Sequence, residues 1–287
     1  MQLSIFGSSG FIGSNFLKIY PKHMPIKRES LEPKTNDILY FISTVDNYNI
    51  FDDITKDVKV NLELLCKVLE NCKSKKITFN FISSWFVYGI NCKQPINESH
   101  RCNPTGFYSI TKKCAEDLLI SFCKTFEVNY RIIRICNVLG NGDKRASAKK
   151  NALTWMINSL KENKPINLYD GGEVYRDYLH VKDVCNAINL ICIKGNKNEI
   201  YNVGSGSPTK LKYMIDLACD YTNSKSKINY IEPPIFHKNV QSKDFWMENK
   251  KIKSEDFSLG KYIFIVFIQD LFLNLILVIS NLKKKIF

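Results

Sequence analysis

Patterns that hold metals or disulfide bonds are absent from this 287-residue sequence. The chain has only four histidines, which are isolated from one another, and none of its ten cysteines forms a C-x-x-C pair. Structural zinc sites use closely spaced cysteine and histidine ligands. A chain of this length can also build a core without disulfide bonds. The sequence therefore predicts no metal site, free thiols and a reducing, cytoplasmic location.

A nucleic-acid-binding motif is also lacking, although the chain carries a formal net charge of +13. Its lysines are scattered and do not alternate with aromatic residues in a basic stretch. We therefore expect no nucleic-acid partner, and the charge fits a phosphate-bearing ligand instead. The first residues contain no basic segment followed by an apolar one, so we expect no secretion signal.

Short apolar segments alternate with segments of helical periodicity in the first half of the chain. This alternation predicts an α/β fold with a Rossmann-type, doubly wound parallel sheet. The expected helices are the segment ending near Tyr20, Val58–Leu69 and Tyr108–Phe126. The expected strands are Leu3–Phe6, a short one at Ile26, Ile38–Ile42, Ile77–Ile82 and Tyr130–Ile135.

The pattern becomes looser after about Asn141, which indicates a smaller C-terminal substrate-binding lobe. We assign residues 1–145 to the NAD(P)-binding domain, with 172–203 returning to it, and 146–171 and 204–260 to the lobe. Residues 261–287 form an atypical apolar tail. It is long enough to approach a membrane span, but polar residues near its middle disfavour one. A helix of the lobe, a peripheral membrane anchor and a frameshifted tail stay open as interpretations.

A glycine-rich turn follows the first expected strand. Gly7, Gly10 and Gly13 permit a tight turn, and Phe11 and Ile12 begin the helix that comes next. The free N–H groups and partial positive charge of a helix N-terminus bind phosphate. A turn of this kind between the first strand and the first helix predicts dinucleotide binding.

The residues at the end of the second strand leave the choice of cofactor open. Glu29 favours NAD, because an acid there binds a ribose 2′-hydroxyl, whereas Lys27 or Arg28 favours the 2′-phosphate of NADP. A solvated charged turn explains the same residues. We retain Arg28 as a candidate cofactor residue, with NAD or NADP as the cofactor.

Three residues form a candidate catalytic set. Tyr108 and Lys112 are four positions apart on an expected helix, so they share one face. A neighbouring cation favours the phenolate and lets a tyrosine act as a base near neutral pH. Ser84 ends a central strand, where its hydroxyl can bind a substrate oxygen that changes between alcohol and ketone. Taken singly, these residues also fit a helix cap or an exposed pair.

Five motifs in this order resemble the extended short-chain dehydrogenase/reductase family of nucleotide-sugar epimerases, dehydratases and reductases. The resemblance extends from Met1 to about Asp256, and the Tyr201–Gly206 segment is similar to a late turn of that family. The motifs are the glycine turn, S-S-x-x-V-Y-G at 83–89, Y-x-x-x-K at 108–112, R-I-C-N-V-L-G at 134–140, and R-D-Y at 176–178 leading to V-K-D-V at 181–184.

The resemblance implies a role for each matching residue. Tyr108 would be the acid/base, Lys112 would lower its pKa and hold the nicotinamide ribose, and Ser84 would orient the substrate oxygen. Asn137 would contact the sugar or its diphosphate, and Arg176 would bind the diphosphate through its planar guanidinium. Asn151 is a weaker candidate for the nucleotide. Alternatively, Arg176 is a surface ion-pair partner of its neighbouring acid and Asn137 a turn residue.

Two departures from the family pattern narrow the prediction. The short charged stretch between Ile26 and Ile38 leaves no room for the helix and strand usual there, so recognition of the adenine is undetermined. Trp85 and Phe86 occupy the positions of the acid and base of the family's dehydratases. Two aromatic rings transfer no protons, which disfavours a dehydratase.

We therefore predict an NAD(P)-dependent epimerase that acts on a nucleotide sugar by transient hydride transfer. The alternatives are an NADPH-dependent reductase of a nucleotide-linked keto-sugar and a non-catalytic nucleotide-binding protein on the same fold. The identity of the sugar and of the base stays open, as does the oligomeric state, for which a homodimer is the candidate.

Overall fold

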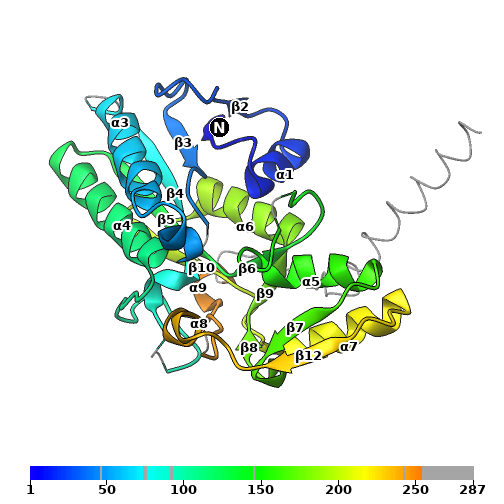
Figure 1. The fold of residues 1–287 in the computed structure, drawn as a ribbon. Helices are drawn as coiled ribbons and strands as arrows, with labels where there is room; N and C mark the ends of the chain where they lie inside the picture. The colour runs from blue at the N-terminus through cyan, green and yellow to red at the C-terminus, as the bar shows by residue number, and fades with distance from the viewer. Residues whose placement is uncertain (46, 74–75, 91–92, 145, 242, 254–287) are drawn as a thin grey trace, which may run out of the picture.

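A six-stranded parallel sheet forms the centre of the molecule (Figure 1). The computed structural model describes residues 1–253 apart from 46, 74–75, 91–92, 145 and 242. The strand order is β10-β5-β4-β3-β1-β2, which confirms the predicted Rossmann-type α/β fold. The strands are β1 (Leu3–Phe6), β2 (Met24–Pro25), β3 (Asp37–Tyr40), β4 (Thr78–Ser84), β5 (Asn129–Ile135) and β10 (Glu199–Val203).

Helices cover both faces of this sheet (Figure 1). On one face α1 (Phe11–Ile19) packs against α6 (Val181–Lys194), and on the other α3 (Leu64–Glu70) packs against α4 (Phe107–Thr125). All seven residues of β4 are consequently buried, as expected of a parallel strand covered on both sides.

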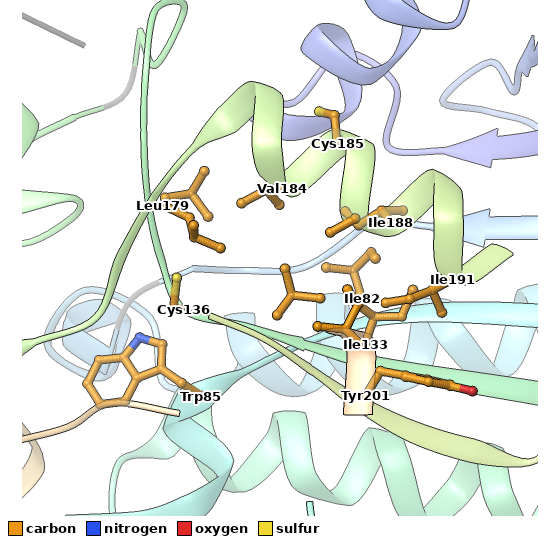
Figure 2. Close-up of a cluster of buried hydrophobic side chains, with 14 of the residues drawn as sticks. Ile82, Trp85, Ile133, Cys136, Leu179, Val184, Cys185, Ile188, Ile191 and Tyr201 are labelled. Carbon is orange, nitrogen blue, oxygen red and sulfur yellow. The ribbon is translucent and has the colours of Figure 1, made fainter. Parts of the chain in front are cut away.

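Apolar side chains of α6 pack against the sheet and form part of the core. Figure 2 shows Val184, Ile188 and Ile191 of α6 directed toward Ile82 and Ile133 of the sheet. All five side chains are buried and belong to one apolar cluster. Burying an aliphatic side chain of this size stabilises a fold by about 1.5–3 kcal/mol. The positions of β4 and β5 are therefore firmly fixed.

The chain after β5 alternates between the sheet and a smaller group of elements with its own apolar core. The predicted division into a sheet domain and a lobe stays a prediction. The further elements are β6 (Asn137–Leu139), α5 (Ala152–Lys161), β7 (Ile166–Tyr169), β8 (Tyr175–Arg176), β9 (Tyr178–His180), β11 (Thr209–Lys210), α7 (Leu211–Thr222), β12 (Ile228–Ile231), α8 (Ile235–Val240) and α9 (Lys250–Lys253).

Several expected elements differ from the observed ones in detail. The second strand ends at Pro25, one residue before Ile26, whose N–H donates to the Ile5 carbonyl at 2.9 Å. The continuous helix expected over Val58–Leu69 is divided into α2 (Lys56–Val58), a π-helical turn (Lys59–Glu63) and α3. Periodicity alone does not distinguish such a turn from a regular helix.

Two further expectations concern the edge of the sheet and the tail. No helix or strand lies between Pro25 and Asp37, as the short stretch predicted. In the structure β2 is an edge strand of the sheet. The tail 261–287 lies outside the described residues. Within the described part of the chain, no helix is long and apolar enough to cross a membrane.

Candidate active site

A cleft of about 730 Å³ lies at the carboxyl ends of β1, β3, β4 and β5. Ligands bind at this end of open α/β sheets. Among the predicted residues only Arg28 is not part of the lining; it is exposed in the turn after β2. The predicted site residues that line the cleft are Gly7, Gly10, Phe11, Ile12, Gly13, Ser84, Tyr108, Lys112, Asn137, Asn151 and Arg176.

The glycine turn brings the backbone of β1 close to the start of α1. Gly7 has a φ of +78°, a conformation that side chains rarely adopt, and its carbonyl accepts from Gly10 N at 3.1 Å. A Cβ on Gly13 would lie 2.5 Å from the Gly7 carbonyl oxygen. No side chain caps α1 at Gly10, so the first N–H groups of the helix remain available to an anion.

Ser84 is the last residue of β4 and is 8% exposed. Its hydroxyl accepts a long hydrogen bond of 3.4 Å from Phe86 N. The following rings of Trp85 and Phe86 stack at 3.9 Å and also line the cleft. The end of β4 therefore presents the Ser84 hydroxyl beside two aromatic rings. Positions 85 and 86 carry no carboxylate.

Tyr108 and Lys112 lie on the first two turns of α4 and are 5% and 2% exposed. The Tyr108 ring meets Phe86 edge-on, with the ring centroids 6.0 Å apart. The Lys112 ammonium lies 4.0 Å from the centroid of Phe81, and among the described residues it forms no ion pair or hydrogen bond. Burial lowers the pKa of Lys112 to about 7, although the charge of Glu116 opposes this shift. Lys112 therefore lines the cleft with a buried amino group that is protonated in only part of the molecules at pH 7.

Arg176 contributes a second buried cation at the lobe side of the cleft. Its Nη1 donates to the Tyr175 carbonyl at 3.0 Å, and the guanidinium also binds the carbonyls of Gln241 and Lys243. Burial lowers its pKa. The alternative of a surface ion pair with Asp177 is wrong, because Asp177 is fully buried and accepts from Ser205 Oγ at 2.6 Å.

The two asparagines support the backbone at the rim of the cleft. Asn137 Nδ2 donates to the Asp177 carbonyl at 3.0 Å, which joins β6 to β9. Asn151 has a φ of +49° and donates to the Val138 carbonyl and to Asp143 Oδ2 at 2.8 Å. These bonds use one amide N–H of Asn137 and both of Asn151, and the prediction that both residues contact a nucleotide sugar stays untested.

Further cleft residues were not predicted from the sequence. His237 of α8 hydrogen-bonds Tyr48 Oη through Nδ1 at 2.9 Å and packs against Tyr169. Burial first, and the charge of Arg176 second, lower the pKa of His237 to about 4, so its imidazole is neutral at pH 7. No local pattern marks a single histidine of this kind. Four lysines outside the predicted set line the same cleft: Lys18, Lys144, Lys149 and Lys150.

The residues present fit a dinucleotide with a diphosphate. The described lining contains six Lys or Arg side chains against two aspartates, Asp143 and Asp170. The N-terminus of α1 follows the glycine turn and has no side-chain cap. Because Gly13 has no Cβ, the backbone of α1 approaches the Gly7 carbonyl closely. When protonated, Lys112 supplies three N–H donors without a protein acceptor among the described residues.

Comparisons with known proteins identify the family. The model of the NAD dependent epimerase/dehydratase family matches residues 39–204, and the chain belongs to this family. This confirms the resemblance found in the sequence.

The relatives include proteins with different reactions. The chain is 31% identical over 169 residues to the dTDP-D-glucose 4,6-dehydratase of Dictyostelium discoideum, a match that covers 55% of this chain and 38% of that protein. It is 26% identical over 251 residues to the GDP-6-deoxy-D-mannose reductase of Pseudomonas aeruginosa, with 79% and 82% covered.

A solved structure with a similar fold is the UDP-glucose 4-epimerase of Thermotoga maritima with UDP-glucose. The TM-score is 0.84 at 19% identity, and the match covers 96% of this chain and all of that one.

Proposed function

We propose that this protein is an NAD(P)-dependent epimerase of a nucleotide sugar. The observation that carries the proposal is that the glycine turn, Ser84, Tyr108 and Lys112 line one cleft. A protein that only binds nucleotides needs the glycine turn but has no use for a phenol and a buried ammonium beside a strand-end hydroxyl. The family to which the chain belongs is named for dependence on NAD and for epimerase and dehydratase reactions.

Each residue has a part that follows from its position. The glycine turn and the N-terminus of α1 would hold the cofactor diphosphate, and Lys112 would bind hydroxyls of the cofactor ribose. When bound, the nicotinamide supplies a hydride acceptor and donor. Tyr108 would remove the proton of a sugar hydroxyl and later return it, while the positive charge of Lys112 stabilises the phenolate. Ser84 would bind the same sugar oxygen and orient it.

The lobe side of the cleft would bind the nucleotide part of the substrate. Arg176 offers a guanidinium suited to a diphosphate, and the lysines of the lining add positive charge. Trp85 and Phe86 replace proton-transferring groups with rings, which supports epimerisation or reduction over elimination of water.

The experiment is incubation of the enzyme with NAD or NADPH and a panel of nucleotide sugars, followed by chromatography and mass spectrometry of the product. An epimerase yields a product of unchanged mass without net consumption of cofactor. A keto-sugar reductase, which the similarity to a reductase favours as the second candidate, consumes NADPH and adds two hydrogens. A nucleotide-binding protein without activity yields no product with any sugar, which would refute the proposal.

Location and assembly belong to the same proposal. We place the enzyme in the cytoplasm, which is consistent with the nine described cysteines being free thiols. Contact of the tail with a membrane and a homodimeric state stay predictions.

A further inference from the structure

A further buried basic residue, Arg134, is paired with Glu116, the carboxylate whose charge acts on Lys112. Arg134 of β5 binds Glu116 of α4 through Nε–Oε1 at 3.0 Å and Nη2–Oε2 at 2.7 Å. The side chains are 3% and 1% exposed. The Arg134 guanidinium also lies 4.7 Å from the centroid of Tyr88. Both carboxylate oxygens of Glu116 are therefore engaged by one guanidinium.

Glu116 is also the carboxylate that could capture Lys112. The two residues are four positions apart on α4, so they lie on the same helical face. No ion pair joins them in this part of the structure, in which Glu116 binds Arg134 instead. A buried ammonium gains strongly from a carboxylate, so a Glu116 side chain with a free oxygen would draw Lys112 away from the cleft.

We propose that Arg134 is a positioning residue whose pairing with Glu116 keeps the Lys112 ammonium free for the cleft. Glu116 is the charged group whose field acts on Lys112, and β4 contributes the uncharged ring of Phe81 beside it. Burial lowers the pKa of Arg134, but its hydrogen bonds to Glu116 and the charge of that residue raise it overall, so Arg134 stays charged. The inference gains its catalytic meaning from the proposed function, since Lys112 is then the group that serves Tyr108 and the cofactor.

The test is a pH titration of Lys112 in the protein without cofactor, by NMR of lysine labelled with ¹³C at Cε, with the signal assigned from Lys112→Arg. Arg134→Met should raise the pKa of Lys112 by about one pH unit or more, because an opposite charge at close range has this effect. Arg134→Lys keeps the charge but leaves one oxygen of Glu116 free, so a smaller rise is expected. Glu116→Gln should lower the pKa.

A double variant separates action through Glu116 from direct repulsion between the two cations. If Arg134 acts through Glu116, Glu116→Gln combined with Arg134→Met should titrate like Glu116→Gln alone. A higher pKa in the double variant, or an unchanged pKa in Arg134→Lys, would overturn the proposal. Arg134→Met leaves a buried carboxylate unpaired and can fail to fold. In that case Arg134→Lys and the double variant are enough to test the proposal.

The matched control is Arg131→Met, on the same strand. Arg131 is also buried, but its partners among the described residues are the Gly195 carbonyl and Asn80 Oδ1, at 2.8 and 3.0 Å, and include no carboxylate. The Arg131→Met variant should have a lower melting temperature than the wild type and an unchanged pKa of Lys112. The titration needs no substrate or cofactor, so failure of the proposed function would appear in the product assay and not in this measurement.

Discussion

Removal of one oxygen atom, Tyr108→Phe, tests the proposed chemistry most directly. The ring stays, and with it the edge-on contact to Phe86 at 6.0 Å and the burial of a side chain that is only 5% exposed. Loss of one hydrogen bond costs about 0.5–1.5 kcal/mol, so we expect the free energy of unfolding to change by no more than that. Without the phenol no group at this position exchanges a proton with the sugar. General acid–base catalysis contributes about 10²–10⁴-fold, so kcat should fall by that factor, or about 3–5 kcal/mol of activation free energy.

Three measurements on one preparation decide the outcome: the melting temperature, the Kd of the cofactor and the single-turnover rate of cofactor reduction. The rate should fall while the other two stay near their wild-type values. A variant that retains full activity would refute the mechanism, although the nucleotide-binding fold would stand.

Tyr88→Phe is the matched control for this variant. Tyr88 is fully buried near the same strand end, and its hydroxyl donates to Asn202 Oδ1 at 2.7 Å. Loss of this bond leaves a buried acceptor short of a donor, which costs about 1–3 kcal/mol. The expected result is the reverse of that for Tyr108→Phe, namely a lower melting temperature with the rate per folded molecule retained. Equal behaviour of both variants would show that the two tyrosines play the same structural part.

The remaining predictions concern the cofactor, the diphosphate and pH. Gly13→Ala should weaken cofactor binding in a titration, since the new Cβ meets the Gly7 carbonyl oxygen at 2.5 Å; an unchanged Kd would contradict the close approach. Arg28→Glu should reduce the affinity for NADPH far more than for NADH if this turn reads the 2′-phosphate, and equal Kd changes would exclude it. Arg176→Gln should raise KM for the nucleotide sugar more than it lowers kcat; loss of stability alone would mean a structural role. Burial raises the pKa of Asp183 to about 6, so the contribution of Asp183 to stability falls as pH rises from about 4 to 6. Asp183→Asn should therefore become more stable than the wild type by up to about 3 kcal/mol over that range. The measurement is the difference in melting temperature, which should stay constant above pH 7.

Local sequence patterns determined the elements of the sheet and the centre of the candidate site. The glycine turn after β1 and the helix that carries Tyr108 and Lys112 were predictable because turn geometry and helical periodicity depend on neighbours in the chain. The expected boundaries of β1 and β5 agree with the structure to within one residue. The ordered motifs also predicted the family, which the comparison confirms.

The tertiary structure alone decided the electrostatics of the site. Lys112 is buried beside Phe81, 31 positions earlier, and its neighbour Glu116 binds Arg134 on another strand. Desolvation depends on everything packed around a group, so the pKa of Lys112 could not be predicted from a four-residue spacing. His237 likewise joins the cleft because α8 packs there, not because of any pattern around it.

Local structure was predictable from the sequence and the electrostatics of the site were not, and this difference has one physical origin. Backbone conformation is governed by interactions between residues close in sequence, so the sequence by itself determined the α/β order, the phosphate-binding turn and the Tyr108–Lys112 pair. Burial and charge pairing arise from residues far apart in sequence. The tertiary structure therefore decided which basic residues line the cleft. Lys18 is part of the lining and Arg28 is not.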